Sequence, residues 1–223
     1  MNHPYRAVVF DFDLTLADTR YGIVECVNFS LGRMGLATHT AERIIASIGV
    51  SHQERYKLLA PPDQGLRFQE YASLYQRRSE DIMPHMTTFY PPAPGVVRLL
   101  KDKGLRLAIV SSAYRSRIEL TLDKAGLRPD FEVIMGYEDV SAAKPDPSGL
   151  LEAIRRLDMP AQQCVYVGDH VVDGEAAQRG GVPFVGVLSG TTQLEALEGF
   201  PHIAILDDLS GLPEALGLAG FAE

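Results

Sequence analysis

Two carboxylates near the start of the chain stand at the spacing that brings them together. Asp11 and Asp13 follow the apolar run 7–10, which predicts a buried strand. Strand side chains two positions apart point to the same side, so both carboxylates face one region. Like charges beside a core repel each other unless a divalent cation or a bound proton compensates them. The pair indicates a metal or acid–base site; the alternative is a solvated loop or a helix cap.

Hydroxyl groups follow a second predicted strand. Ser111 and Ser112 come directly after the apolar run 105–110 and before a helical pattern. Hydroxyl and backbone N–H groups at the start of a helix suit a phosphate. The neighbouring residues in the sequence favour a role for Ser111 as a helix N-cap, and phosphate binding is the alternative.

Further charges lie after a third strand and in the loop before it. Asp169 and Asp173 follow the run 164–167, and Lys144 precedes Pro145. The residue before a proline is disfavoured in a helix, so Lys144 should lie on an extended segment. The alternatives are a helix cap for Asp173 and a solvated surface position for Lys144.

The elements that must position these residues alternate between strands and helices. Buried strands are expected at 7–10, 105–110, 131–135, 164–167, 183–188 and 203–206, and helices at 95–103, 115–125, 147–157 and 173–179. This alternation predicts an α/β fold, with a Rossmann-like parallel sheet core that is covered on both faces. Ligands of such sheets bind beyond the carboxyl ends of the strands, where all the candidate residues fall.

One long stretch interrupts this alternation. Between Leu16 and the proline-rich segment 90–95 no convincing strand is found, and helical patterns cover 18–34, 40–48, 51–60 and 64–81. We therefore expect a catalytic core of residues 1–16 and 91–223 and an all-helical cap of residues 17–90. The Ala/Gly-rich tail after Leu212 is expected to fray.

The composition restricts the classes of function. The chain has 223 residues, 46% of them hydrophobic and 22% charged, with a formal net charge of −8. A negative charge argues against nucleic acid as a partner, and no apolar run is long enough to span a membrane. Cys26 and Cys164 fit neither a disulfide framework nor a zinc site. With no signal-peptide pattern and two isolated thiols, a cytoplasmic location is expected. We expect a monomer or a homodimer.

Together the segments make chemical sense. Carboxylates bind Mg²⁺, and Mg²⁺ with a lysine would neutralise a phosphoryl group. These segments resemble the sequence motifs of the haloacid dehalogenase superfamily, specifically those of its phosphatases. Within the superfamily, the chain looks most like the phosphoglycolate-phosphatase-like enzymes. The resemblance covers residues 6–188, includes the cap, and rests on four motifs, which lie at 11–15, 109–112, 144–145 and 168–173.

The resemblance implies a role for each charged residue. Asp11 would be the nucleophile that forms an aspartyl-phosphate, and Asp13 the general acid and then base. Lys144 would pair with Asp11 and the transferring group. The ligands of Mg²⁺ would be Asp11, Asp169, Asp173 and the backbone carbonyl of Asp13.

Smaller roles are implied for the neighbours. Ser111 would bind the phosphoryl oxygens with backbone N–H groups near Phe12 and Ser112, and Thr15 would steady the loop. Two positions depart from the family pattern. Leu14 stands where many members carry Gly, which limits the loop's conformational freedom. His170 replaces a small hydroxyl residue and is expected to be structural or solvated, with substrate contact as the alternative.

The substrate should be selected by the cap. Residues 48–55 resemble the family's substrate-specificity loop, in which His52 or Arg55 would meet an anionic leaving group. The alternative places both side chains in solvent.

We therefore expect a Mg²⁺-dependent phosphatase that acts on a small phosphorylated metabolite, either phosphoglycolate-like or a sugar phosphate. A phosphosugar mutase and a non-catalytic regulatory member remain alternatives. A hydrolytic dehalogenase is disfavoured, because that chemistry uses neither an acid at Asp13 nor a metal.

Overall fold

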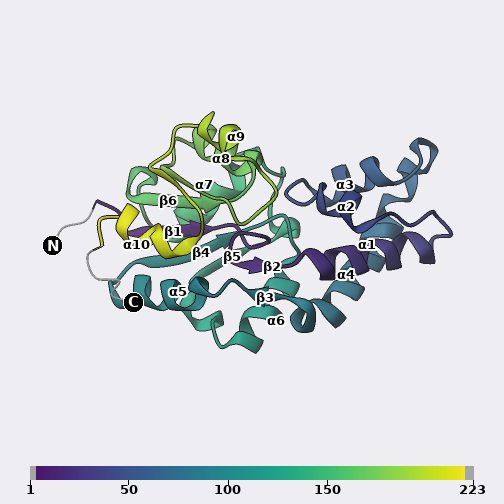
Figure 1. The fold of residues 1–223 in the computed structure, drawn as a ribbon, viewed down its shortest axis with the longest axis horizontal. Helices are drawn as coiled ribbons and strands as arrows, with labels where there is room; N and C mark the ends of the chain where they lie inside the picture. Colours follow the sequence, from purple (N-terminus) through teal and green to yellow (C-terminus); the bar gives the residue numbers. More distant parts are fainter. Residues whose placement is uncertain (1–3, 219–223) are drawn as a thin grey trace.

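The computed structural model describes residues 4–218 and has a parallel sheet at its centre (Figure 1). The strands run in the order β5-β4-β1-β6-β7-β8, and every neighbouring pair is parallel. They are β1 (Ala7–Phe10), β4 (Arg106–Val110), β5 (Val133–Met135), β6 (Cys164–Gly168), β7 (Phe184–Val187) and β8 (Ala204–Leu206). The predicted α/β class is confirmed, and β1, which precedes the paired carboxylates, lies between β4 and β6.

Helices cover both faces of the sheet, as β-branched strands without polar alternation require. One face packs against α5 (Pro92–Asp102), α6 (Arg115–Ala125) and α10 (Leu212–Ala215). The other packs against α7 (Ser148–Arg156), α8 (Val171–Gly180) and α9 (Leu194–Glu198). Within the described residues, no helix combines the length and apolar character needed to cross a membrane.

The remaining helices lie to one side of the sheet, at the right of Figure 1. These cap helices are α1 (Arg20–Arg33), α2 (Ala41–Ile45), α3 (His52–Leu59) and α4 (Phe68–Met86). They enclose a hydrophobic cluster of their own, which also takes in Leu14 and Tyr114 from the segments that follow β1 and β4. The cap helices therefore pack directly on the loops at the carboxyl edge of the sheet.

Three local expectations were wrong. The stretch 16–90 does contain strands, β2 (Ala17–Asp18) and β3 (Thr88–Phe89), which pair antiparallel but are too short to leave a sequence pattern. Residues 62–67 form a 3₁₀ helix before α4, and α4 then continues beyond residue 81, with Pro84 in its last turn.

The tail after Leu212 is ordered up to residue 218. Leucines, rather than the Ala/Gly content, decide this, because Leu212, Leu216 and Leu218 are buried in the main core. Residues 219–223 lie outside the described residues.

Candidate active site

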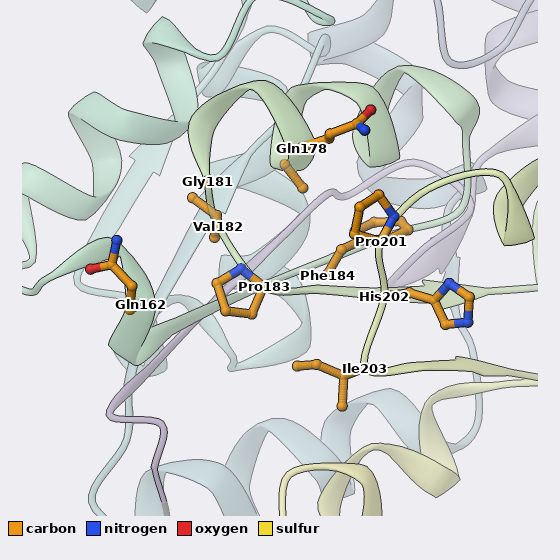
Figure 2. A pocket seen from close by; sticks show the side chains of 10 residues that line it. Gln162, Gln178, Gly181, Val182, Pro183, Phe184, Pro201, His202 and Ile203 are labelled. Carbon is orange, nitrogen blue, oxygen red and sulfur yellow. The ribbon is translucent and has the colours of Figure 1, made fainter.

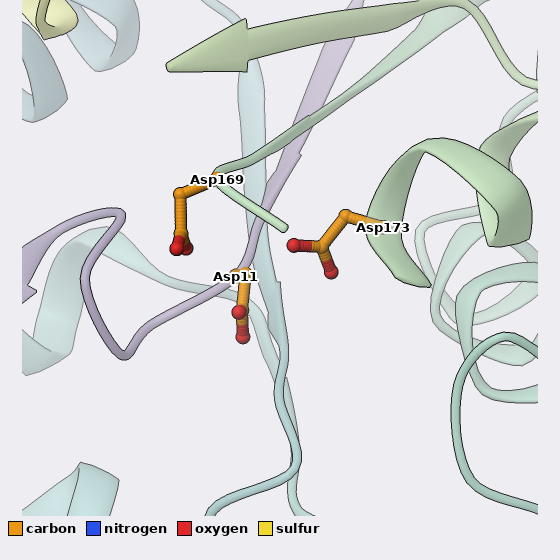
Figure 3. Close-up of side chains that lie close together, drawn as sticks. All are labelled: Asp11, Asp169 and Asp173. Carbon is orange, nitrogen blue, oxygen red and sulfur yellow. The ribbon is translucent and has the colours of Figure 1, made fainter. Parts of the chain in front are cut away.

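Three buried carboxylates meet at the carboxyl edge of the sheet. Asp11 follows β1 and Asp169 follows the adjacent β6, so parallel pairing brings them to the same edge. Asp173 lies in the first turn of α8, from which it points back toward the other two (Figure 3). One oxygen from each carboxylate lies within 4.8 Å of the others. The structure thus brings together the three aspartates from motifs one and four.

Lys144 is the cation of this cluster. Its Nζ lies 3.2 Å from Oδ1 of Asp11 and donates to Oδ1 of Asp173 at 2.6 Å. It also donates to the hydroxyl of Tyr166 at 3.1 Å, and that hydroxyl lies 2.9 Å from Asp173. The surface position considered for Lys144 is therefore wrong. Tyr166 was missed by the sequence analysis, although a phenol in the otherwise apolar β6 is a signal for a polar partner at the sheet edge.

The cluster carries more negative than positive charge. Burial raises the pKa of Asp11 to about 6, against the opposing effect of Lys144. Burial and the charges of Asp173 and Asp11 raise the pKa of Asp169 well above its ordinary value. Oδ1 of Asp11 is buried without a hydrogen-bond partner. Three carboxylates beside a single ammonium, with one carboxylate oxygen that accepts no hydrogen bond, form a donor set that fits a hard divalent cation such as Mg²⁺.

Two neighbours fix Asp169. The hydroxyl of Thr15 donates to Oδ1 of Asp169 at 2.7 Å, so in this structure Thr15 supports a carboxylate of the cluster. Gly190, in the loop after β7, approaches Asp169 so closely that a methyl group there would overlap the carboxylate. Both contacts limit the rotamers that Asp169 can adopt.

Ser111 lies next to Asp11 and is buried. A hydrogen bond from Ser111 opposes the rise in the pKa of Asp11. The residue that caps α6 is Tyr114, so Ser111 is not that helix's N-cap. Ser112 follows it at the same edge and is partly exposed. The Ser111 hydroxyl therefore lies beside the carboxylate that is expected to be the nucleophile.

Asp13 stands apart from the three clustered carboxylates. Both of its oxygens accept hydrogen bonds from Nη2 of Arg117, at 2.9 and 2.7 Å. The guanidinium of Arg117 also lies over the ring of Phe12, 5.6 Å from its centroid. The sequence analysis missed Arg117; the available signal was its position beside Ile118 on the buried side of α6.

The cap residues His52 and Arg55 are both buried, so placing them in solvent was wrong. The His52 ring packs against Tyr75, Tyr114 and Tyr137, with centroids 4.7, 4.8 and 5.1 Å away. Burial lowers the pKa of His52 well below its ordinary value, and neither ring nitrogen has a hydrogen-bond partner. Arg55 donates through Nε to the carbonyl of Ser47 at 3.4 Å.

His170 has a structural role. Its Nδ1 accepts from the backbone N–H of Val172, and its own N–H donates to Asp173 at 3.0 Å. The N-cap of α8 is thus His170, and the cap considered at Asp173 is wrong. The His170 ring also faces Gly49, where an added methyl would overlap it.

A separate pocket of about 440 Å³ lies at the opposite edge of the sheet (Figure 2). Gln162, Pro183 and Ile203 line it just before β6, β7 and β8 begin. Ligands of parallel sheets bind at the carboxyl ends of strands, so this pocket is at the wrong edge. No carboxylate lines it, and it offers no chemistry comparable to that of the aspartate cluster.

Comparison with known proteins agrees with this geometry. The family model of haloacid dehalogenase-like hydrolases matches residues 8–187. A phosphoglycolate phosphatase of Shigella boydii is 29% identical over 234 residues, covering 96% of this chain and 93% of the relative. The phosphoglycolate phosphatase of Escherichia coli K12 is also 29% identical over the same span.

Solved structures give the same result. A chain from Bacteroides fragilis, described as a haloacid dehalogenase-like hydrolase, superposes with a TM-score of 0.86 at 35% identity, over 93% of this chain and 99% of that one. A hydrolase from Pseudomonas syringae superposes with a TM-score of 0.76 at 27% identity, over 96% of this chain and 100% of that one. The chain belongs to the haloacid dehalogenase-like hydrolase family.

Proposed function

We propose that this protein is a Mg²⁺-dependent phosphatase that hydrolyses a small phosphomonoester through an aspartyl-phosphate on Asp11. The observation that carries the proposal is the environment of Asp11. It is buried between Lys144 and two further carboxylates, with a second acid two residues away. Asp11 is the member of the cluster that belongs to the first motif, where the resemblance to the family puts the nucleophile.

The residues divide into binding and chemistry. Asp11, Asp169 and Asp173 would hold Mg²⁺, together with the backbone carbonyl of Asp13. When bound, the cation supplies neutralising charge for the phosphoryl oxygens. Lys144 adds positive charge on the same side, and Ser111 and the N–H groups of Phe12 and Ser112 would donate to those oxygens.

The first step transfers the phosphoryl group to the enzyme. An Oδ of Asp11 attacks phosphorus while the bond to the leaving oxygen breaks, and Asp13 gives its proton to that oxygen. In the second step Asp13, now a carboxylate, takes a proton from water as the water oxygen attacks phosphorus. Inorganic phosphate leaves, Asp11 is regenerated and Asp13 is protonated again.

The substrate class is proposed from the relatives and from the cap. The curated relatives named phosphoglycolate phosphatase support a small, anionic phosphomonoester. Arg55 and His52, which are buried in the first two turns of α3, would contact the leaving group and so select it. A sugar phosphate is the second candidate, because nothing in the aspartate cluster itself discriminates between leaving groups.

The test is phosphate release from a panel of phosphorylated metabolites, including 2-phosphoglycolate and sugar phosphates, with Mg²⁺ or with EDTA. We expect turnover only with the metal, and a loss of at least about 10⁴-fold in Asp11→Asn. Asp123→Asn, on the exposed side of α6, is the matched control and should keep full activity.

Two outcomes would redirect the proposal. Interconversion of sugar phosphates without release of phosphate would indicate a mutase. Absence of turnover across the panel would support a non-catalytic role.

A further inference from the structure

An arginine from the core helix α6 is buried against the candidate acid–base residue. Arg117 is 1% exposed, and its Nη2 donates to both oxygens of Asp13. Arginine is almost never fully buried unless it is paired. Here the partner is the one aspartate of the first motif that takes no part in the carboxylate cluster.

The pairing is exclusive among the described residues. Nε and Nη1 of Arg117 are buried and have no hydrogen-bond partner, and Asp13 supplies its only ion pair. Burial is the largest influence on the pKa of Arg117 and lowers it, but the charge and hydrogen bond of Asp13, together with Tyr75 and Cys26, raise it above its ordinary value. The guanidinium also lies over the ring of Phe12, 5.6 Å from its centroid, which is an attractive cation–π contact.

A buried pair of this kind is weak evidence for stability, because taking both ions out of water offsets most of their attraction. A fixed cation is useful where negative charge develops during a reaction. In the proposed mechanism, that happens on Asp13: when it gives its proton to the leaving oxygen, it becomes a carboxylate beside Arg117.

We propose that Arg117 is a positioning residue for Asp13, one that orients its carboxyl group and compensates the charge it acquires as the leaving group departs. The inference rests on the proposed phosphatase function. Because Arg117 would act on proton transfer by Asp13, the effect of replacing Arg117 must depend on whether the leaving oxygen needs a proton.

Leaving groups of different acidity provide the test. An alkyl phosphate such as 2-phosphoglycolate needs a proton on its leaving oxygen, whereas 4-nitrophenyl phosphate releases a stable phenolate. The ratio kcat/KM reports events up to leaving-group departure. For Arg117→Met we expect kcat/KM to fall about 100-fold with the alkyl phosphate and less than about fivefold with the aryl phosphate. Arg117→Lys, which keeps the charge, should recover part of the loss.

A double-mutant comparison separates positioning from packing. If Arg117 acts only through Asp13, then Arg117→Met should cause no further loss of kcat/KM in an Asp13→Asn background. The double variant also removes both buried charges, so it remains foldable if the single variant is not. Arg128→Met, which breaks the surface pair with Glu119, is the matched control and should behave as wild type.

The outcomes are distinct. Absence of phosphatase turnover in the wild type would refute the proposed function. Turnover in the wild type with equal losses on both substrates, or additive losses in the double variant, would overturn the role of Arg117 and leave the proposed function in place.

Discussion

Gly49 of the cap lies against the imidazole ring of His170, the residue that follows Asp169. Gly49 has φ +105, a conformation that favours glycine, and a methyl group there would overlap the His170 ring. The loop expected to select the substrate therefore touches the motif that holds the carboxylate cluster. The contact is available only when the cap is seated on the core as in this structure.

Gly49→Ala should therefore impair seating of the cap and lower kcat/KM about tenfold or more, because excluding water from the site requires closure. Replacing His170 by Ser, which keeps a capping oxygen, should restore part of the activity in the double variant, because it removes the overlap but not the backbone strain of Ala at φ +105. Gly35→Ala is the control: it has φ +71 but open space around it. If Gly49→Ala alone has no more effect than Gly35→Ala, the contact has no role in closure.

Metal binding should stabilise the protein more at pH 7.5 than at pH 5. The pKa of Asp11 is raised from 3.8 to about 6, so the folded state binds this proton more tightly than the unfolded state. Protonation of Asp11 therefore stabilises the metal-free folded state fully below pH 3.8, and this stabilisation is lost as the pH rises through about 6. The free energy of unfolding changes by roughly 3 kcal/mol at most between these limits. Asp169 shifts in the same direction.

The measurement is thermal unfolding in EDTA and in Mg²⁺ at both pH values. The rise in Tm on adding Mg²⁺ should be larger at pH 7.5, because Asp11 and Asp169 are then deprotonated and can bind the cation without first releasing a proton. Asp11→Asn should reduce this pH dependence. A larger rise at pH 5 would contradict the assignment.

At Leu14 a Gly substitution should give a more stable protein than an Ala substitution, which is the reverse of the usual order. It has φ +61 and is buried in the cluster of the cap helices. Leu14→Ala should cost about 2–5 kcal/mol for the lost packing and keep a left-handed strain of roughly 1–2 kcal/mol. Leu14→Gly loses the same packing but relieves the strain, so it should be the more stable of the two.

Leu16 is the matched control, because it is equally buried but does not have a positive φ. There Gly should be less stable than Ala by about 0.5–1 kcal/mol. Chemical denaturation of the four variants decides the point. The same order at both positions would show that the backbone at Leu14 is not strained.

Tyr166→Phe should weaken both stability and turnover. Its hydroxyl lies 3.1 Å from Nζ of Lys144, 2.9 Å from Asp173 and 3.2 Å from the carbonyl of Val110. Removing this hydroxyl leaves buried polar groups without one hydrogen-bond partner, which should lower the free energy of unfolding by about 1–3 kcal/mol. Lys144 also loses one of the contacts that hold its ammonium group in place. We expect kcat to fall about tenfold. Tyr21→Phe, at a position 71% exposed, should change neither quantity.

The sequence predicted what depends on local pattern. Asp11 and Asp169 could be placed at one edge because apolar runs identify parallel strands, and the ends of such strands coincide. The burial of His52 could not be predicted, because it depends on rings from three elements distant in the sequence.

The partner of Asp13 was beyond the same reasoning. Arg117 lies 104 positions along the chain from Asp13, and only the pairing of β1 with β4 brings the start of α6 beside the first motif. A helical pattern identifies the buried side of α6 but does not say which loop faces it. Residue types thus indicated the chemistry, whereas long-range packing determined which residue acts on which.

The short β2–β3 ladder has a consequence for how this enzyme could be rebuilt. Ala17 pairs with Phe89 and Asp18 with Thr88, so the chain leaves the core and returns to it at the same place. The two ends of the cap insertion therefore lie side by side, so the cap could be exchanged for that of another family member without changing the connections of the sheet. Leu14 and Tyr114 would have to be exchanged with it, because they belong to the transplanted segment's hydrophobic cluster although they lie outside its ends.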